Sequence, residues 1–148
     1  MRSKARGFTI VEIAVVIAII SVLLTLTLVV YNRIQVSARD DRRTADIIAI
    51  KRSIVNYYND NGEYPSCAAA GTECTLAYIT PNLQKYMNPV PTLDPSGSNY
   101  IYISNPSMNQ YALFLDYENS AKCKTGTNMN SSWWGSVSDC DTSYPNRF

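Results

Sequence analysis

Residues 8–31, FTIVEIAVVIAIISVLLTLTLVVY, constrain the fold of this chain more than any other segment. They contain a single charged residue, Glu12, and no glycine or proline. About 20 consecutive apolar residues are enough for a helix to cross a bilayer, so the segment predicts a membrane-spanning helix. An ionised carboxylate on a lipid-facing helix is costly and rare, so Glu12 requires a partner or a function.

Glu12 also lies at a defined distance from a basic N-terminus and a glycine–phenylalanine junction. Three basic side chains lie within residues 1–6, and Gly7 and Phe8 follow directly. This arrangement resembles the N-terminus of type IV pilins and pseudopilins. In that family a prepilin peptidase cleaves a short basic leader after a glycine, and the new first residue is N-methylated. The fifth mature residue is a glutamate that acts in filament assembly.

The resemblance implies a role for each residue around the junction. Cleavage between Gly7 and Phe8 removes the leader, residues 1–7, and Phe8 is then methylated. Thr9 fits the common second mature position, and Glu12 is the assembly glutamate. Cleavage leaves a cationic amine on Phe8, to which a neighbouring subunit presents Glu12. Two charges that are each costly in an apolar environment are tolerated there as a pair.

An ordinary signal anchor is the alternative, with Glu12 extending toward the lipid headgroups. Such anchors have no use for an acid at this position. A removable secretory peptide fits less well, because no small-residue cleavage site bounds a short apolar core.

Length and charge limit the remaining possibilities. The 148 residues leave room for one domain beyond the apolar helix. The leader holds three of the thirteen basic residues, so ten remain against twelve acidic residues and the mature side-chain charge is −2. This balance does not indicate a protein that binds nucleic acid.

The cysteines predict an extracytoplasmic domain. All four follow the apolar helix: Cys67, Cys74, Cys123 and Cys140. An even number on one side indicates an oxidising compartment with two disulfides, and therefore a cytoplasmic N-terminus. Three connectivities are possible, and the short segment between Cys67 and Cys74 favours pairing these two. Cys123 and Cys140 then close the C-terminal region, which resembles that of type IV pilins. The spacing is not that of a zinc site, and the chain has no histidine.

The helix is predicted to continue over residues 32–60. No glycine or proline occurs between Phe8 and Gly62, and Gly62 suits a left-handed C-terminal cap. On a helical wheel two apolar bands appear, one formed by Ile47, Ile50, Ile54 and Tyr57 and the other by Ile48 and Val55, with Lys51 between them. We expect one of the two bands to pack on the subunit's own sheet and the other to contact neighbouring subunits. One broad face with Lys51 extending outward is the alternative.

Residues 39–43, RDDRR, form a mixed charge cluster on this helix. Such clusters are usually solvated and contribute little to stability. In a filament the same charges would set the register between subunits, which is the alternative.

The C-terminal half predicts a small sheet. Residues 61–98 are rich in turn-forming residues and predict a connecting loop, with a short helix at 80–87. Residues 99–148 are expected to form an antiparallel sheet and the disulfide-bounded region, with strands at 100–104, 110–117 and 132–137. Alternation puts Tyr111, Leu113, Leu115 and Tyr117 toward the helix. The fold class is therefore α+β, a long N-terminal α-helix packed on a small C-terminal antiparallel β-sheet, as in pilins.

The sequence contains no catalytic constellation. Without histidine the usual base for a serine or cysteine nucleophile is missing, and no phosphate-binding glycine loop occurs. Oxygen ligands for calcium, which some major pseudopilins bind in their C-terminal loop, are available at Asp116, Glu118, Asp139 and Asp141. Their spacing matches no calcium motif, and solvated loop acids are the favoured interpretation. We expect neither an enzyme nor a cofactor.

The resemblance implies a structural function, the major subunit of an extracellular type IV pilus that serves adhesion, twitching motility or DNA uptake. The implied partners are other copies of the chain, the prepilin peptidase, the inner-membrane assembly platform and, before assembly, the cytoplasmic membrane. The first alternative is a pseudopilin of a type II secretion system. The second, from another class, is a single-pass membrane-anchored extracellular binding domain.

Overall fold

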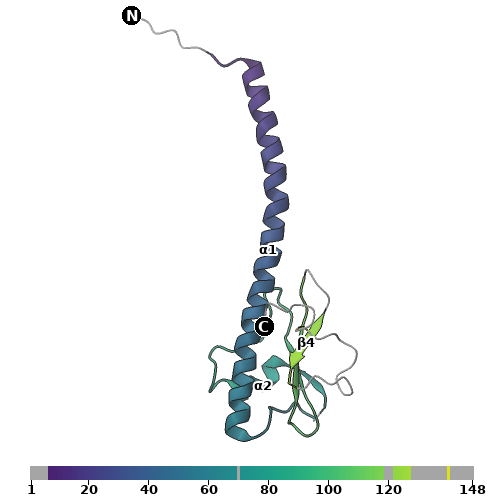
Figure 1. Ribbon diagram of the computed structural model, residues 1–148. Coiled ribbons are helices and arrows are strands. Elements are labelled where there is room, and N and C mark those ends of the chain that lie inside the picture. The colour runs from purple at the N-terminus through teal and green to yellow at the C-terminus, as the bar shows by residue number, and fades with distance from the viewer. Residues whose placement is uncertain (1–6, 70, 119–121, 128–139, 141–148) are drawn as a thin grey trace, which may run out of the picture. The chain divides into compact units, whose positions relative to one another are not determined.

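The computed structural model describes residues 7–69, 71–118, 122–127 and 140. The chain divides into two compact units, Met1–Val36 and Ser37–Phe148, and one helix runs through both. In order, the elements are α1 Ile10–Asn61, β1 Glu73–Thr75, α2 Leu76–Leu83, β2 Ile101–Ser104, β3 Tyr111–Leu115 and β4 Cys123–Gly126 (Figure 1). A long N-terminal helix and a small antiparallel sheet confirm the predicted α+β class.

The first unit consists of the apolar part of α1. The large hydrophobic side chains described between Phe8 and Ile34 are 48% to 89% exposed, and by length and composition the helix can cross a membrane. Hydroxyl groups in this part donate to the carbonyl oxygen four residues earlier, Ser21 at 2.7 Å and Thr25 and Thr27 at 2.8 Å. These bonds satisfy the hydroxyls within the helix, so they remain compatible with an apolar environment.

α1 ends at Asn61, one residue beyond the predicted end. Gly62 has φ +77°, and its N–H donates to the carbonyl oxygen of Tyr58 at 2.7 Å. The predicted left-handed cap at Gly62 is therefore confirmed, and glycine adopts this conformation without a Cβ penalty.

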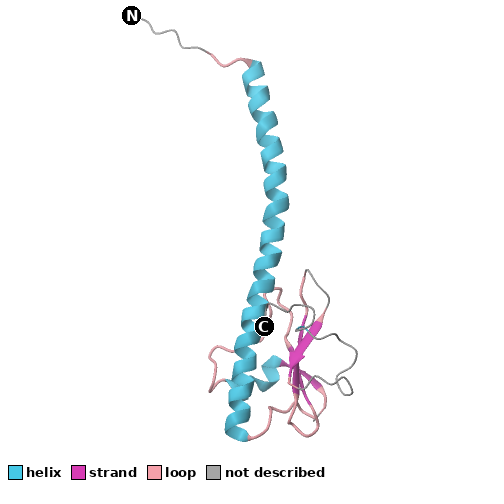
Figure 2. Cartoon of the chain, in the orientation of Figure 1, coloured by secondary structure: helices cyan, strands magenta, loops and turns pink. Residues whose placement is uncertain are grey.

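In the second unit the C-terminal half of α1 lies alongside the sheet (Figure 2). Ile47, Ile50 and Ile54 are fully buried in a core that they share with residues of the sheet. Of the two predicted bands, this one therefore faces the sheet. Ile48 is only partly buried and Val55 is 39% exposed, so the second band is not covered by the described residues.

The sheet has the strand order β1-β2-β3-β4, and every pair is antiparallel. β2 and β3 are the predicted hairpin, with Ile101 opposite Phe114 and Ser104 opposite Tyr111. Neither β1 nor β4 is predicted from the sequence, because these strands are three and four residues long and show no alternation. The predicted strand at 132–137 lies outside the described residues.

The two faces of β3 follow the predicted alternation. The main core buries Tyr111, Leu113, Leu115 and, just beyond the strand, Tyr117. Ala112 instead packs with Ile103 and Phe114 in a smaller cluster. The more apolar face therefore lies against α1, as predicted.

The short helix begins four residues earlier than predicted. α2 spans Leu76–Leu83, not 80–87, and Pro81 lies inside it. Leu76, Ile79 and Leu83 are fully buried at a spacing that puts them on one helical face. Burial of this face outweighs the preference of proline for the first turn, which was the basis of the prediction.

Two disulfides join Cys67 to Cys74 and Cys123 to Cys140, which are the pairings favoured by the sequence. Cys74 belongs to β1 and Cys123 to β4, so each bridge fastens one edge strand. Strands this short pair weakly by themselves, and the bridges hold them to the rest of the second unit.

Candidate assembly site at the start of the apolar helix

Thr9 and Glu12 form a reciprocal cap at the N-terminus of α1. Glu12 Oε2 accepts hydrogen bonds from the backbone N–H and the hydroxyl of Thr9, both at 2.8 Å. The Glu12 N–H in turn donates to the Thr9 hydroxyl oxygen at 3.2 Å. Because α1 starts at Ile10, Thr9 is the residue before the helix and Glu12 is the third helical residue. This is a capping box, and it explains why threonine and glutamate occur three positions apart.

The capping box leaves one carboxylate oxygen available. Both bonds from Thr9 reach Oε2, and Oε1 has no hydrogen-bond partner in the part of the chain that the structure describes. The Glu12 side chain is exposed. A cation from another molecule can therefore approach Oε1 while the bonds to Thr9 remain in place.

Gly7 and Phe8 precede the helix and are exposed, Phe8 at 84%. A Cβ atom added at Gly7 would meet no atom within 4 Å. The described surroundings of Gly7 therefore impose no steric need for glycine. The basic residues of the leader lie outside the described residues.

A second polar group surrounds Arg43 in the second unit. The Arg43 side chain is 2% exposed and pairs with Asp40 at 2.6 Å, Asp94 at 2.9 Å and Glu118 at 3.1 Å. Arg39 donates two hydrogen bonds to Glu118, at 2.6 and 2.5 Å. We call these five residues the Arg43 cluster.

The interpretation of residues 39–43 as a solvated surface is wrong for Asp40 and Arg43, which are buried within the subunit. The helix pattern does not reveal this, because two of the carboxylates that pair with Arg43 lie 51 and 75 residues further along the chain.

The pKa values of Arg43, Asp94 and Glu118 are shifted in the direction that favours their charged forms. Burial lowers the pKa of Arg43, but hydrogen bonds to Asp94, Asp40 and Glu118 outweigh burial and raise it. Burial raises the pKa of Asp94, but hydrogen bonds, one of them from Arg43, lower it by more. The pKa of Asp94 therefore lies below its usual value. The hydrogen bond from Arg39 lowers the pKa of Glu118 to about 2. Burial opposes this shift, and a hydrogen bond from Arg43 adds to it. The cluster therefore holds two loops on α1 by charge at neutral pH.

The acidic residues considered for calcium have other partners where the structure describes them. Asp116 pairs with Lys122 at 3.1 Å, and Glu118 pairs with Arg39 and Arg43. No group of three or more potential metal-ligating side chains occurs among the described residues. Asp139 and Asp141 lie outside them.

The fold and the N-terminal site together define a class of protein. A helix with an apolar first half, a capped glutamate at its start and a small antiparallel sheet packed on its second half is the architecture of a pilin-like filament subunit. Comparisons with known proteins agree. The profile of a family described as the prokaryotic N-terminal methylation motif matches residues 2–28. The type II secretion system core protein G of Escherichia coli (strain K12) is 35% identical over an alignment of 119 residues, and the alignment covers 74% of this chain and 79% of that protein.

The chain belongs to the pilin and pseudopilin family. Its members are structural subunits and not enzymes. The matched motif and the exposed apolar helix indicate a membrane-anchored precursor. A comparison with solved structures gave no significant match.

Proposed function

We propose that this chain is a filament subunit whose assembly depends on an ion pair between Glu12 and the N-terminal amine of Phe8 in a neighbouring copy. A prepilin peptidase removes residues 1–7, and Phe8 is N-methylated. The precursor stays in the cytoplasmic membrane, with its N-terminus in the cytoplasm, until an inner-membrane assembly platform adds it to the filament. Residues 8–31 then form the filament core, and residues 32–148 lie outside the membrane.

The geometry of Glu12 carries this proposal. Thr9 holds one carboxylate oxygen, which fixes the side chain near the start of the helix and leaves Oε1 for a second cation. In an apolar filament core an unpaired carboxylate is costly, whereas a close ion pair with satisfied hydrogen bonds is tolerated. The amine released at Phe8 by cleavage is a cation of the required kind.

Two substitutions of Glu12 separate its charge from its cap. Glu12→Ala removes both, whereas Glu12→Gln keeps a side chain that completes a capping box without a negative charge. We expect both variants to reach the membrane and to be cleaved, and both to lose filament assembly, measured by shearing and electron microscopy. Mass spectrometry of the mature protein is expected to find methylated Phe8 at the N-terminus.

Ser21→Ala is the matched control, because Ser21 is a polar residue of the same apolar segment whose hydroxyl bonds only within its own helix in the described residues. We expect it to assemble normally. Wild-type levels of filaments from Glu12→Gln would show that the cap matters and the charge does not. An uncleaved N-terminus in the wild-type protein supports a membrane-anchored binding domain instead.

The similarity to a type II secretion system core protein supports a pseudopilin of such a system as the setting of this filament. A surface type IV pilus is the second candidate. It is favoured by the Cys123–Cys140 bridge, which resembles the disulfide-bounded C-terminal region of type IV pilins.

Deletion of the gene distinguishes the two settings. Loss of proteins from the culture medium, with surface pili unchanged, supports the secretion pseudopilin. Loss of surface pili, together with adhesion, twitching motility or DNA uptake and with secretion intact, supports the major pilin.

A further inference from the structure

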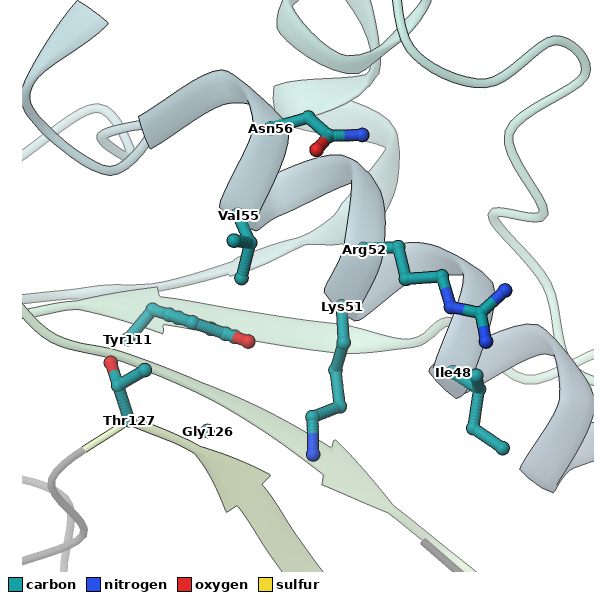
Figure 3. A pocket seen from close by; sticks show the side chains of 8 residues that line it. All are labelled: Ile48, Lys51, Arg52, Val55, Asn56, Tyr111, Gly126 and Thr127. Carbon is teal, nitrogen blue, oxygen red and sulfur yellow. The ribbon is translucent and has the colours of Figure 1, made fainter. Parts of the chain in front are cut away.

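A groove of about 640 Å³ lies between the C-terminal half of α1 and the adjoining strands β3 and β4 (Figure 3). Ile48 and Val55, the apolar band that the subunit's own core leaves uncovered, line it on the helix side. Tyr111 lines it on the sheet side. A volume of this size accommodates a large side chain and its neighbours.

The rim of this groove is positively charged. Lys51 extends across it, and its Nζ donates to the Thr125 hydroxyl at 2.9 Å. Arg52 is exposed and makes no ion pair with the residues that the structure describes. An occupant that matches the groove therefore combines an apolar group with a carboxylate.

The segment β1–α2 of the same chain carries both kinds of group, an exposed tyrosine and an exposed carboxylate, and neither lines the groove. Tyr78 is 55% exposed on α2, and it does not line the groove. Glu73 is exposed on β1 and has no cationic partner among the described residues. Within the described part of the second unit, the large hydrophobic side chains exposed by more than a third are Val55, Tyr78 and Leu93. Of these three, Val55 lines the groove, and Tyr78 is the most exposed.

We infer that the groove receives Tyr78 of a second copy of this chain, with Glu73 of that copy facing Arg52. The inference rests on the proposed filament function and gives it a contact outside the apolar core. Because groove and Tyr78 are different surfaces of one subunit, the contact is heterologous, and such contacts build open helical assemblies when they do not close. The buried tyrosine ring contributes most of the contact area, and the exposed charge pair fixes its orientation.

Cross-linking between introduced cysteines tests the contact in cells that express the full chain. The described residues contain no free cysteine, so a short bismaleimide reacts with introduced thiols and spares the native bridges. We expect Val55→Cys/Tyr78→Cys in one chain to give a ladder of multimers. Val55→Cys and Tyr78→Cys chains expressed together are expected to give dimers only. Either single variant expressed alone is expected to give no cross-linked product. Val55→Cys/Leu93→Cys is the matched control, because Leu93 is an equally exposed apolar residue outside the inferred contact.

Charge reversal tests the orientation. Arg52→Glu and Glu73→Arg, each placed in the Val55→Cys/Tyr78→Cys background, are expected to lower the cross-linking yield about twofold to fivefold, as befits an exposed ion pair. The two reversals together are expected to restore it. Equal cross-linking yields in the background chain, the two single reversals and the double reversal would overturn the role of the Arg52–Glu73 pair.

Three results overturn the contact and leave the filament function standing. The first is a Val55–Tyr78 cross-linking yield no higher than that of the Leu93 control in cells that form Glu12-dependent filaments. The second is a Val55→Cys thiol that does not react with maleimide in detergent-solubilised monomers, which would mean that the subunit fills its own groove. The third is a cross-link from Val55→Cys to another protein, which assigns the groove to that partner. If the wild-type chain forms no filaments, both the proposed filament function and the inferred contact are overturned.

Discussion

Replacing Arg43 by methionine removes the cation at the centre of the Arg43 cluster while keeping a long side chain. The side chains of Arg43, Asp40 and Asp94 are 2%, 7% and 7% exposed, so two carboxylates remain buried without their cation. Breaking a buried ion pair by removing one partner costs about 3–5 kcal/mol. Glu118 adds little to this cost, because its side chain is 29% exposed and it keeps its bonds to Arg39.

The remaining donors put the expected loss near the lower end of that range. Asp94 keeps bonds from the N–H groups of Ser96 and Ser98 and from the Ser96 hydroxyl. Asp40 keeps the bond from the Glu118 N–H. We therefore expect Arg43→Met to lower the free energy of unfolding by about 3 kcal/mol, a large share of the roughly 5–15 kcal/mol typical of a domain.

The assay is urea denaturation of the detergent-solubilised chain, followed by the circular dichroism of its tyrosines. Arg42→Met is the control, since Arg42 is the exposed neighbour on the same helix, and its expected change is within about 0.5 kcal/mol. A loss below 1 kcal/mol for Arg43→Met, equal to that of the control, would refute the reasoning that the cluster is buried and coupled.

The pH dependence gives a second measurement of the same cluster. Glu118 has a pKa of about 2 in the folded chain against a usual 4.5, so the unfolded chain takes up its proton first. Its stabilising contribution is complete above about pH 4.5 and is lost as the pH falls toward about 2. Arg43→Met is expected to reduce this acid-side loss only in part, because the hydrogen bond from Arg39, which lowers the pKa of Glu118 most, remains.

Three further substitutions test the packing of the second unit by the same denaturation assay. Gly126→Ala puts a Cβ 2.0 Å from the carbonyl oxygen of Tyr111, so β3 and β4 must separate and the expected loss is about 1–3 kcal/mol; an unchanged midpoint would contradict this strand pairing. Ile50→Ala empties a fully buried position and is expected to cost about 2–5 kcal/mol, whereas a loss below 1 kcal/mol would mean that Ile50 is not in the core. Cys123→Ser/Cys140→Ser opens a loop closed over a separation of 17 residues and is expected to cost about 3 kcal/mol, and equal stability of both chains would rule out a stabilising bridge.

Much of the fold could be predicted because its signals are local. The cap at Gly62, the β2–β3 hairpin and the inward face of β3 each depend on residues within one or two turns or strands of each other. The fully buried band at Ile47, Ile50 and Ile54 follows from helical periodicity alone. At the N-terminus, Glu12 is singled out as the one charge of an apolar segment and Thr9 by the resemblance to pilins, whereas their reciprocal hydrogen bonds are visible only in the structure.

Other features could not be predicted because their energy comes from distant residues. β1 and β4 are short and lack alternation, and they are strands because a neighbouring strand and a disulfide hold them. α2 begins at Leu76 because the core takes up one of its faces, although Pro81 suggests a later start. The groove at Val55 is likewise visible only once β3 and β4 lie beside α1.

The sequence by itself determined that residues 8–31 form an apolar helix with a single glutamate near its start, since hydrophobicity acts over a few residues. Only the tertiary structure decided that Arg43 is a buried cation and Val55 the edge of a groove. A helix surface carries no record of which distant carboxylate or strand will cover it, because that choice is made by the packing of the whole unit.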